Sequence, residues 1–251
     1  MRLIAVANQK GGVGKTTTTL NVAHALALGG RRVAVLDLDP QANLTVAFGF
    51  VHPRAGMDQV LRDGVPPSIL AVPARDQIRL VPAGFGLARL EAAQDGVAIG
   101  ADRLKEMLDG EFQDCDLVLI DCPPASGLLV VNALFATDEV LTPVATDYLS
   151  LVGLSHLLGT FRQFERRLGR KLQQWIAITR YTSDSRLARE VEAKLRSYFP
   201  GRVLDRPVRE DSALAESPSF GKTIFEYRND SPGAWDYRVL AEDLLQRRTM
   251  R

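Results

Sequence analysis

Lysine, glycine and threonine residues crowd into one short stretch near the start of the chain, KGGVGKTT. The pattern G-x-x-x-x-G-K-[ST] binds nucleotide phosphates, because its glycines let backbone amides point at phosphate oxygens while its lysine adds a positive charge. Gly14, Lys15 and Thr16 supply the end of this pattern, but Gln9 stands where its first glycine is expected. A second lysine, Lys10, follows Gln9. The stretch therefore predicts phosphate chemistry in an altered loop.

The residues expected to bind a nucleotide share this loop and the first turn of the helix that follows it: Gly11, Gly12, Val13, Gly14, Lys15, Thr16 and Thr17. Lys15 can reach the β- and γ-phosphates, and Thr16 can ligate Mg²⁺. The positive end of the helix dipole also favours an anion. The alternative is a glycine-rich turn that binds nothing. The apolar run before the loop and the helical pattern after it favour a nucleotide site.

Three carboxylates follow the ends of apolar runs. Asp37 and Asp39 stand together at the end of one run, and Asp121 ends another. Phosphoryl transfer needs a metal ion and an oriented water, which carboxylates gathered at one edge of a sheet can position. Any one of them could instead be a strand-ending carboxylate that caps a loop. Three beside a phosphate loop favour a shared site.

The order of apolar and amphipathic segments predicts the elements that must position these groups. Strands are expected over residues 3–7, 32–37, 116–121, 139–144 and 175–179, and helices over 17–28, 101–108, 151–168, 186–198 and 234–247. This alternation is typical of an α/β fold with a mostly parallel, doubly wound sheet and helices on both faces. Residues 49–77 are expected to be an irregular surface excursion. Residues 212–232 are expected to form long loops near the carboxyl edge of the sheet, where ligands bind in such folds.

The composition is ordinary for a folded soluble chain, with 46% hydrophobic and 24% charged residues and a net charge of +1. Charges interrupt every apolar run before it reaches the roughly 18 residues of a membrane span. Two cysteines, Cys115 and Cys122, are too few for a disulfide framework, so they are expected to be buried thiols in a cytoplasmic protein. We expect one domain over residues 1–251, and the nine residues before Lys10 leave no room for an N-terminal helix-turn-helix domain.

The motifs resemble one known family. The stretch KGGVGKTTT resembles the deviant Walker A motif of the ParA/MinD ATPases, whose signature lysine corresponds to Lys10. The resemblance continues through VLDLDPQAN, LVLIDCPPASGLLVVNAL and ALAESPSFGKTIFEY, and so spans nearly the whole chain. It is strongest to the ParA/Soj branch of plasmid and chromosome partition ATPases, whose fold is of the P-loop NTPase type.

The resemblance implies a role for each charged residue of the site, with ATP and Mg²⁺ as cofactors. Lys10 and Lys15 are the implied catalytic lysines, and Lys10 would cross to the phosphates of the partner subunit in an ATP-bound homodimer. There it would stabilise the charge that develops in the transition state. Asp39 would orient the attacking water, Asp37 would support the phosphate-loop network, and Asp121 would hold Mg²⁺ through water.

The implied adenine contacts are weaker. They fall on the end of the strand that contains Thr179 and on the later loop near Val208. In some relatives an asparagine stands at the end of this strand, where the present chain has Thr179. A second departure is Val152, which stands where Soj-like relatives commonly carry an acidic residue.

The resemblance also implies a function: an ATP-dependent dimer that binds DNA without sequence preference, associates with the nucleoid, and is released when a ParB-like centromere-binding protein stimulates its slow hydrolysis. Arg186 aligns with a basic DNA-contacting position of Soj-like relatives, and Arg189 can share its helix face. The further candidates for DNA contact are Arg209, Lys222 and Arg228. A solvated helix face is the competing interpretation for these residues.

Three other functions compete with DNA partition. A MinD-like division-site ATPase would carry a C-terminal amphipathic membrane helix, but Asp236, Glu242 and Asp243 interrupt the C-terminal segment, so no membrane partner is expected. A metabolic P-loop ligase would need a separate small-molecule site and would not need Lys10. A ParA-like ATPase that positions a protein cargo would share every motif.

Overall fold

The computed structural model describes residues 1–51, 55–92, 100–124, 127–147, 159, 162–163, 165–166 and 168–250. These residues contain a seven-stranded sheet in the order β3-β4-β2-β5-β1-β6-β7. Its strands are β1 (Arg2–Val6), β2 (Val33–Asp37), β3 (Val72–Arg75), β4 (Ile78–Val81), β5 (Leu117–Asp121), β6 (Glu139–Ala145) and β7 (Gln173–Thr179). Only β3 runs antiparallel to its neighbour, so the prediction of a mostly parallel sheet is confirmed.

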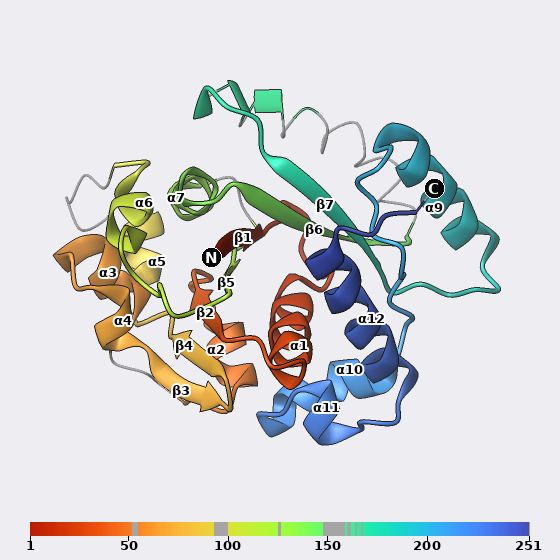
Figure 1. Cartoon of the computed structure of the whole chain (residues 1–251), viewed down its shortest axis with the longest axis horizontal. Coiled ribbons are helices and arrows are strands. Elements are labelled where there is room, and N and C mark those ends of the chain that lie inside the picture. Colours follow the sequence, from red (N-terminus) through yellow and green to blue (C-terminus); the bar gives the residue numbers. More distant parts are fainter. Residues whose placement is uncertain are drawn as a thin grey trace.

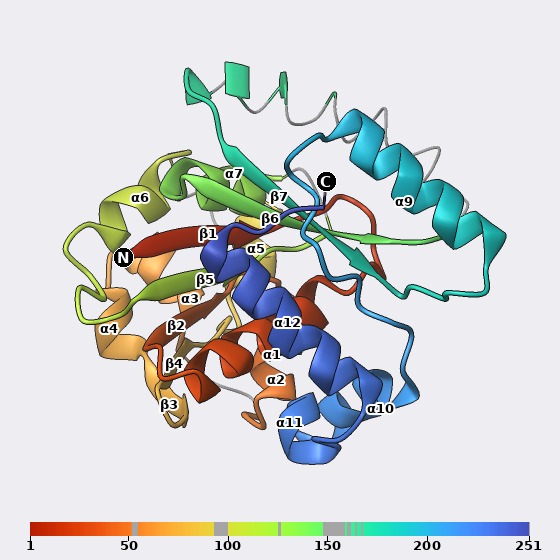
Figure 2. The ribbon, with the colours of Figure 1, turned by 45° about the vertical axis from the view of Figure 1, so that its right-hand side comes forward.

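Helices cover both faces of the sheet (Figure 1). One face carries α3 (Met57–Asp63), α5 (Leu87–Glu91), α6 (Arg103–Leu108), α7 (Leu128–Ala136) and α9 (Arg186–Tyr198). The other carries α1 (Lys15–Leu28), α2 (Asn43–Ala47), α10 (Ser212–Glu216), α11 (Ile224–Tyr227) and α12 (Pro232–Gln246). Figure 2 shows α1 and α12 side by side in front of the strands. The short helix α4 (Pro67–Leu70) precedes β3. The doubly wound arrangement is therefore confirmed.

The strand sequences explain the two layers. Successive side chains of a strand point to opposite faces of a sheet, so a strand covered on both faces must be apolar throughout. In β2, Ala34 and Leu36 belong to one core, whereas Val33 and Val35 belong to the other. All five residues of β2 are buried, including Asp37 at its carboxyl end. The polar residue at this end is therefore delivered from a rigid strand to the edge of the sheet.

The two outer edges of the sheet are closed in different ways. Residues 202–210 run along β7, where Val208 donates a backbone hydrogen bond to the carbonyl of Ile178 at 2.8 Å and Tyr181 donates one to Val208 at 2.9 Å. The C-terminal residues join this segment, since the amide of Met250 donates to the carbonyl of Val203 at 2.9 Å. At the other edge, the short strand β3 contains Pro73, which has no amide hydrogen to offer.

Two sequence-based expectations were wrong. The segment at residues 49–77 holds α3, α4 and the start of a hairpin between β3 and β4, which the pattern of prolines and glycines concealed. The segment at residues 212–232 consists mainly of short helices, α10, the 3-10 helix η1 (Ser217–Phe220) and α11, rather than long loops. The expected helix at 151–168 and Val152 lie mostly or wholly outside the described residues. None of the described helices is long and apolar enough to cross a bilayer.

Candidate nucleotide-binding site

The glycine-rich loop joins the carboxyl end of β1 to the first turn of α1. Gly12 and Gly14 have φ angles of +73° and +85°, values that favour glycine, and Gly14 is the residue that precedes the helix. Asn8 steadies the start of the loop, since its side chain accepts a hydrogen bond from the amide of Lys10 at 3.0 Å and donates one to the carbonyl of Pro143 at 2.8 Å. The loop therefore has the tight backbone turn that phosphate binding requires.

Lys15 lies inside the loop rather than in solvent. Only 7% of the residue is exposed, and its Nζ donates to the carbonyl of Lys10 at 3.1 Å. Burial lowers the pKa of Lys15, while the nearby charges of Asp121 and Asp39 oppose that shift. A phosphate placed in the loop would give this ammonium group a charged partner in place of a carbonyl oxygen, which strengthens the interaction.

Lys10 points to a different partner. Its Nζ contacts both carboxylate oxygens of Asp147, at 2.5 and 2.7 Å, just beyond the carboxyl end of β6. The side chain of Lys10 is 30% exposed and that of Asp147 is 48% exposed, so the pair lies at the surface of the site. The two lysines of the loop are therefore held by separate contacts, one buried and one near solvent.

Asp121 is joined to the helix that follows the loop. It accepts hydrogen bonds from Thr16 at 2.8 Å and from Thr19 at 2.9 Å, and no part of it is exposed. Asp37 lies beside it as its partner in the register of β2 and β5. Burial, and secondly the charge of Asp37, raise the pKa of Asp121 well above its usual range. Two buried carboxylates on neighbouring strands suit a nearby divalent cation, whose charge would stabilise the ionised form of Asp121.

Asp37 is linked to the residues that follow β2. It accepts two hydrogen bonds from Thr45, from the amide at 2.9 Å and the hydroxyl at 2.6 Å, and a third from the amide of Asp39 at 3.1 Å. The Thr45 hydroxyl also accepts from the amide of Ala83 at 3.2 Å, beyond the end of β4. Burial raises the pKa of Asp37 despite these donors. The carboxyl ends of β2, β4 and β5 are therefore tied into one network.

Two cavities flank the loop and share Gly12, Gly14 and Thr17. The first, of about 510 Å³, is lined by residues of the loop and by Asp39, Asn43 and Val46, with Pro218 and Ser219 of η1 on its wall. The second, of about 320 Å³, is lined by Thr179 at the end of β7, by residues 208–211, and by Tyr237 of α12. The structure thus brings Lys15, Thr16 and Asp39 to one cavity, and Thr179 and Val208 to the other.

A metal ion would find few direct protein ligands in this site. Within the described part of the chain, no cluster of three His, Cys, Asp or Glu residues is arranged to hold one. Mg²⁺ in phosphate sites keeps several waters and binds the phosphates with one or two protein groups. The hydroxyl of Thr16, backed by Asp121, fits that kind of coordination.

The sequence-predicted DNA-binding residues do not form one cluster. Arg186 and Arg189 lie on the exposed face of α9, and Lys222 and Arg228 are exposed near η1 and α11. Arg209 directs its guanidinium at Asp236, with Nε 2.8 Å from the carboxylate. The two α9 residues therefore offer neighbouring exposed cations on one helix, whereas Arg209 is held by a buried carboxylate.

Sequence reasoning missed several residues of the site. Thr19 could have been found, since it lies one helical turn from Thr16 and shares its face. Thr45 follows a motif that was singled out for its acidic residues alone. Asp147 and Tyr237 had no signal in the sequence, because each reaches the loop from a distant segment.

A family model, proteins of similar sequence and solved structures each match most of this chain. A family model described as an AAA domain, AAA_31, matches residues 1–174. The chromosome-partitioning ATPase Soj of Thermus thermophilus is 42% identical over 248 residues, covering 98% of this chain and 96% of the relative. The fold also resembles the structure of a cobyrinic acid a,c-diamide synthase from Mycobacterium smegmatis with a bound ATP analog and magnesium, at 33% identity and a TM-score of 0.81 over 98% of this chain and 95% of that one.

A putative plasmid partition protein of Borrelia burgdorferi, bound to AMPPNP, matches with a TM-score of 0.83, covering 98% of both chains. At 22% identity this likeness speaks for the fold alone. The family match, the Thermus relative and the altered loop with its two lysines agree with one another. The chain belongs to the ParA/MinD family of P-loop ATPases, in its ParA/Soj branch.

Proposed function

We propose that this chain is a partition ATPase that uses ATP as a switch for binding DNA. In this proposal ATP and Mg²⁺ bind at the glycine-rich loop and drive the formation of a homodimer, which binds DNA without sequence preference. A ParB-like protein on the cargo then stimulates hydrolysis and releases the dimer. The name of the 42% identical Thermus relative, a chromosome-partitioning ATPase, supports a chromosome as the cargo.

The arrangement of Lys10 and Lys15 carries this proposal. Lys15 is buried within its own loop, where it can bind the phosphates of the nucleotide in the same subunit. Lys10 instead lies on Asp147 at the surface of the site. A lysine held there can exchange one anionic partner for another when a second copy of the chain approaches. This supports a role for Lys10 towards the nucleotide of the partner subunit.

The remaining residues have separable tasks in hydrolysis. The loop amides and Lys15 hold the phosphates, and Thr16 with Asp121 would hold Mg²⁺, which neutralises the charge of the transferring group. Asp39 lines the same cavity and accepts a hydrogen bond from the amide of Gln41 at 3.0 Å. This contact fixes one carboxylate oxygen, and the other can orient a water for attack. Slow turnover of the monomer is expected, because Lys10 completes the site only in the dimer.

A ligase function is the alternative that one comparison favours, since the Mycobacterium smegmatis neighbour at 33% identity carries the name of a diamide synthase. Such an enzyme activates a carboxylate with ATP and must also bind that carboxylate. In our proposal the two cavities that flank the loop would receive the phosphates and the base of the nucleotide, so neither of them would remain for a carboxylate substrate. This leaves the partition function as the better-supported proposal.

The proposal can be tested with the purified chain in ATP and Mg²⁺. We expect light scattering to show a dimer with ATP but a monomer with ADP, and we expect unrelated DNA duplexes to bind only in the ATP state. Lys15→Ala should abolish both effects, because the loop would lose its buried cation. ATP hydrolysis that depends on an added carboxylate and an ammonia donor, and is indifferent to DNA, would overturn the proposal in favour of a ligase.

A further inference from the structure

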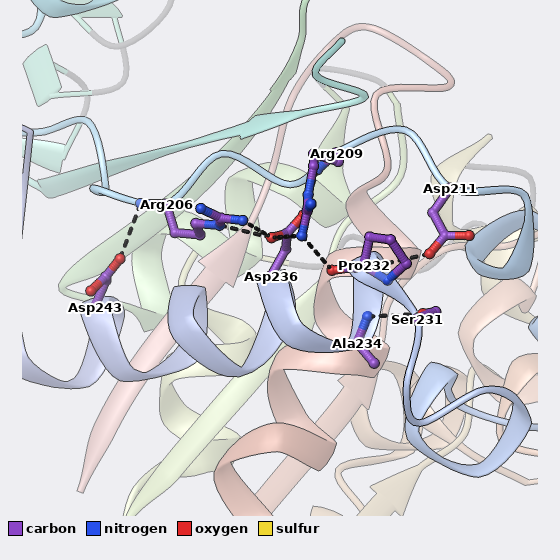
Figure 3. Close-up of polar contacts among 9 residues, drawn as sticks. Arg206, Arg209, Asp211, Ser231, Pro232, Ala234, Asp236 and Asp243 are labelled. Carbon is purple, nitrogen blue, oxygen red and sulfur yellow. Dashed lines mark hydrogen bonds and ion pairs between the residues drawn. The ribbon is translucent and has the colours of Figure 1, made fainter. Parts of the chain in front are cut away.

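One buried carboxylate of α12 anchors the segment that walls the second cavity. Asp236 is fully buried and accepts hydrogen bonds from two arginines of residues 206–211 (Figure 3). Arg206 donates from Nε to Oδ1 at 2.7 Å, and a second guanidinium nitrogen of Arg206 contacts the same oxygen. Arg209 donates to Oδ2 from its backbone amide at 3.0 Å and from Nε at 2.8 Å, and to Oδ1 at 3.0 Å. A single carboxylate therefore holds both arginines.

Two residues, Pro207 and Val208, lie between these arginines, and Val208 faces the nucleotide site. Pro207 restricts the backbone, and Val208 is buried against the end of β7 and lines the 320 Å³ cavity. Val208 accepts a hydrogen bond from the amide of Tyr181 at 2.9 Å, which sets its distance from the end of β7 and so from Thr179. The position of this cavity wall thus depends on the two arginines on either side of it.

The same segment is fixed to α12 at two further points. The amide of Arg206 donates to Asp243 at 3.1 Å. Asp211 accepts hydrogen bonds from the amide of Gly233, in the first turn of α12, and from the amide of Ala213 of α10, both at 2.9 Å. Because the segment meets α12 at several places, this helix acts as its frame.

Helix α12 also contacts α1, the helix that follows the phosphate loop. Tyr237, next to Asp236, lines the cavity and lies with its hydroxyl 3.2 Å from the hydroxyl of Thr18 in α1. Tyr237 is buried, and α1 packs against α12, with the two helices side by side in Figure 2. One helix therefore sets the distance between the phosphate loop and the wall of the second cavity.

We propose that Asp236 is a positioning residue for the nucleotide base: it holds residues 206–211 in place so that the wall of the second cavity is formed before the nucleotide arrives. This inference rests on the proposed ATP site. Asp236 does not itself line the cavity, and it acts through Arg206 and Arg209. Preorganisation of this kind raises affinity because the free protein has already lost the freedom that binding would otherwise remove.

The experiment compares ligands that do and do not carry a base. Isothermal titration in Mg²⁺ measures the affinities for ATP, for GTP and for inorganic tripolyphosphate in the wild type and in Asp236→Asn. We expect tripolyphosphate to bind both proteins within about twofold, because the loop and Lys15 are unchanged. We expect ATP to bind Asp236→Asn at least about tenfold more weakly, a difference of about 1.4 kcal/mol, and the preference for ATP over GTP to shrink.

Glu139→Gln is the matched control. Glu139 is also a buried carboxylate that pairs with two arginines, Arg2 at 2.6 Å and Arg247 at 3.6 Å, but it lies at the amino end of β6, away from the cavities. This variant should be less stable than the wild type, but its ratio of ATP affinity to tripolyphosphate affinity should be that of the wild type. If Asp236→Asn does not fold, Arg206→Gln tests the same contact with Arg209 still in place, since Arg206 does not itself line the cavity. This variant should lower the same ratio of affinities.

The outcomes separate this inference from the proposed function. A wild type that binds neither ATP nor tripolyphosphate would overturn the proposed function, and this inference with it. A wild type that binds ATP while the folded variant keeps the same ATP to tripolyphosphate ratio would overturn the positioning role alone. Equal losses for both ligands would also overturn it, because they would indicate general damage to the fold.

Discussion

The exposed face of α9 offers a quantitative test of DNA binding. The side chain of Arg186 is 87% exposed and pairs with Glu190 at 2.9 Å within the helix, and Arg189 donates to the carbonyl of Ser183 at 2.7 Å. Both cations can turn to a phosphate at little cost, since exposed ion pairs contribute little to stability. We predict that Arg186→Gln combined with Arg189→Gln weakens DNA binding while ATP-dependent dimerisation is unchanged.

The size of the effect follows from counterion release. Each phosphate contact contributes about −0.9 to the slope of log affinity against log salt, and a dimer would present the pair twice, or about four contacts. The slope should therefore become shallower by about 3.6 in the double variant. Between about 50 and 200 mM salt, the wild type should lose roughly 150-fold more affinity than the variant.

Fluorescence anisotropy with unrelated duplexes, repeated over a salt series in ATP and Mg²⁺, measures both slopes. Arg62→Gln is the control, since Arg62 lies on α3, on the opposite side of the molecule from α9 (Figure 1), and pairs with Asp63 at 2.8 Å. It should keep the wild-type slope. A double variant that keeps the wild-type slope would contradict this prediction, and so would an Arg62→Gln slope as shallow as that of the double variant. Either result would mean that the α9 face is a solvated surface and not the DNA contact.

Three further predictions concern the site and its support. Lys10→Ala should retain ATP binding but lose dimerisation or stimulated hydrolysis, which light scattering and phosphate release would show; unchanged dimerisation and stimulation would mean that Lys10 is an ordinary surface lysine. Asp39→Ala should bind ATP and accumulate as dimer because water is no longer oriented; rapid hydrolysis would contradict this. Burial lowers the pKa of His24, which lies 2.6 Å from the Thr223 hydroxyl. Unfolded histidine therefore takes up protons that folded His24 resists, so the contribution of His24 to the free energy of unfolding should fall as pH drops below about 6.5. In urea unfolding, the free energy of unfolding of the wild type minus that of His24→Asn should fall over this pH range; a constant difference would refute the assignment.

The parts of the fold that follow from local pattern could be predicted from the sequence. The strand before the phosphate loop, the helix after it and the buried strands ending in Asp37 and Asp121 all carry continuous apolar runs beside polar ends. Such runs have one stable arrangement in a covered sheet, so the position of the phosphate loop among these elements followed as well.

The rest depended on contacts that no local pattern reports. The helices α10, η1 and α11 are only four or five residues long, which is too short for helical periodicity to be visible. Asp236 was evidence against a membrane helix in the sequence, whereas in the structure it receives arginines 27 and 30 residues away. The role of a carboxylate on the inner face of a helix can be assigned only when its partners in the fold are known.

The closed edges of the sheet bear on how copies of this chain can assemble. Strand addition needs a free row of backbone donors and acceptors, but residues 202–210 occupy that row along β7, and Pro73 interrupts it on β3. Neither edge therefore favours head-to-tail growth into open fibres by backbone pairing. Association is left to side-chain surfaces, which can close on themselves around a two-fold axis and stop at two copies. We expect concentrated solutions to show a discrete species rather than a continuous ladder of sizes.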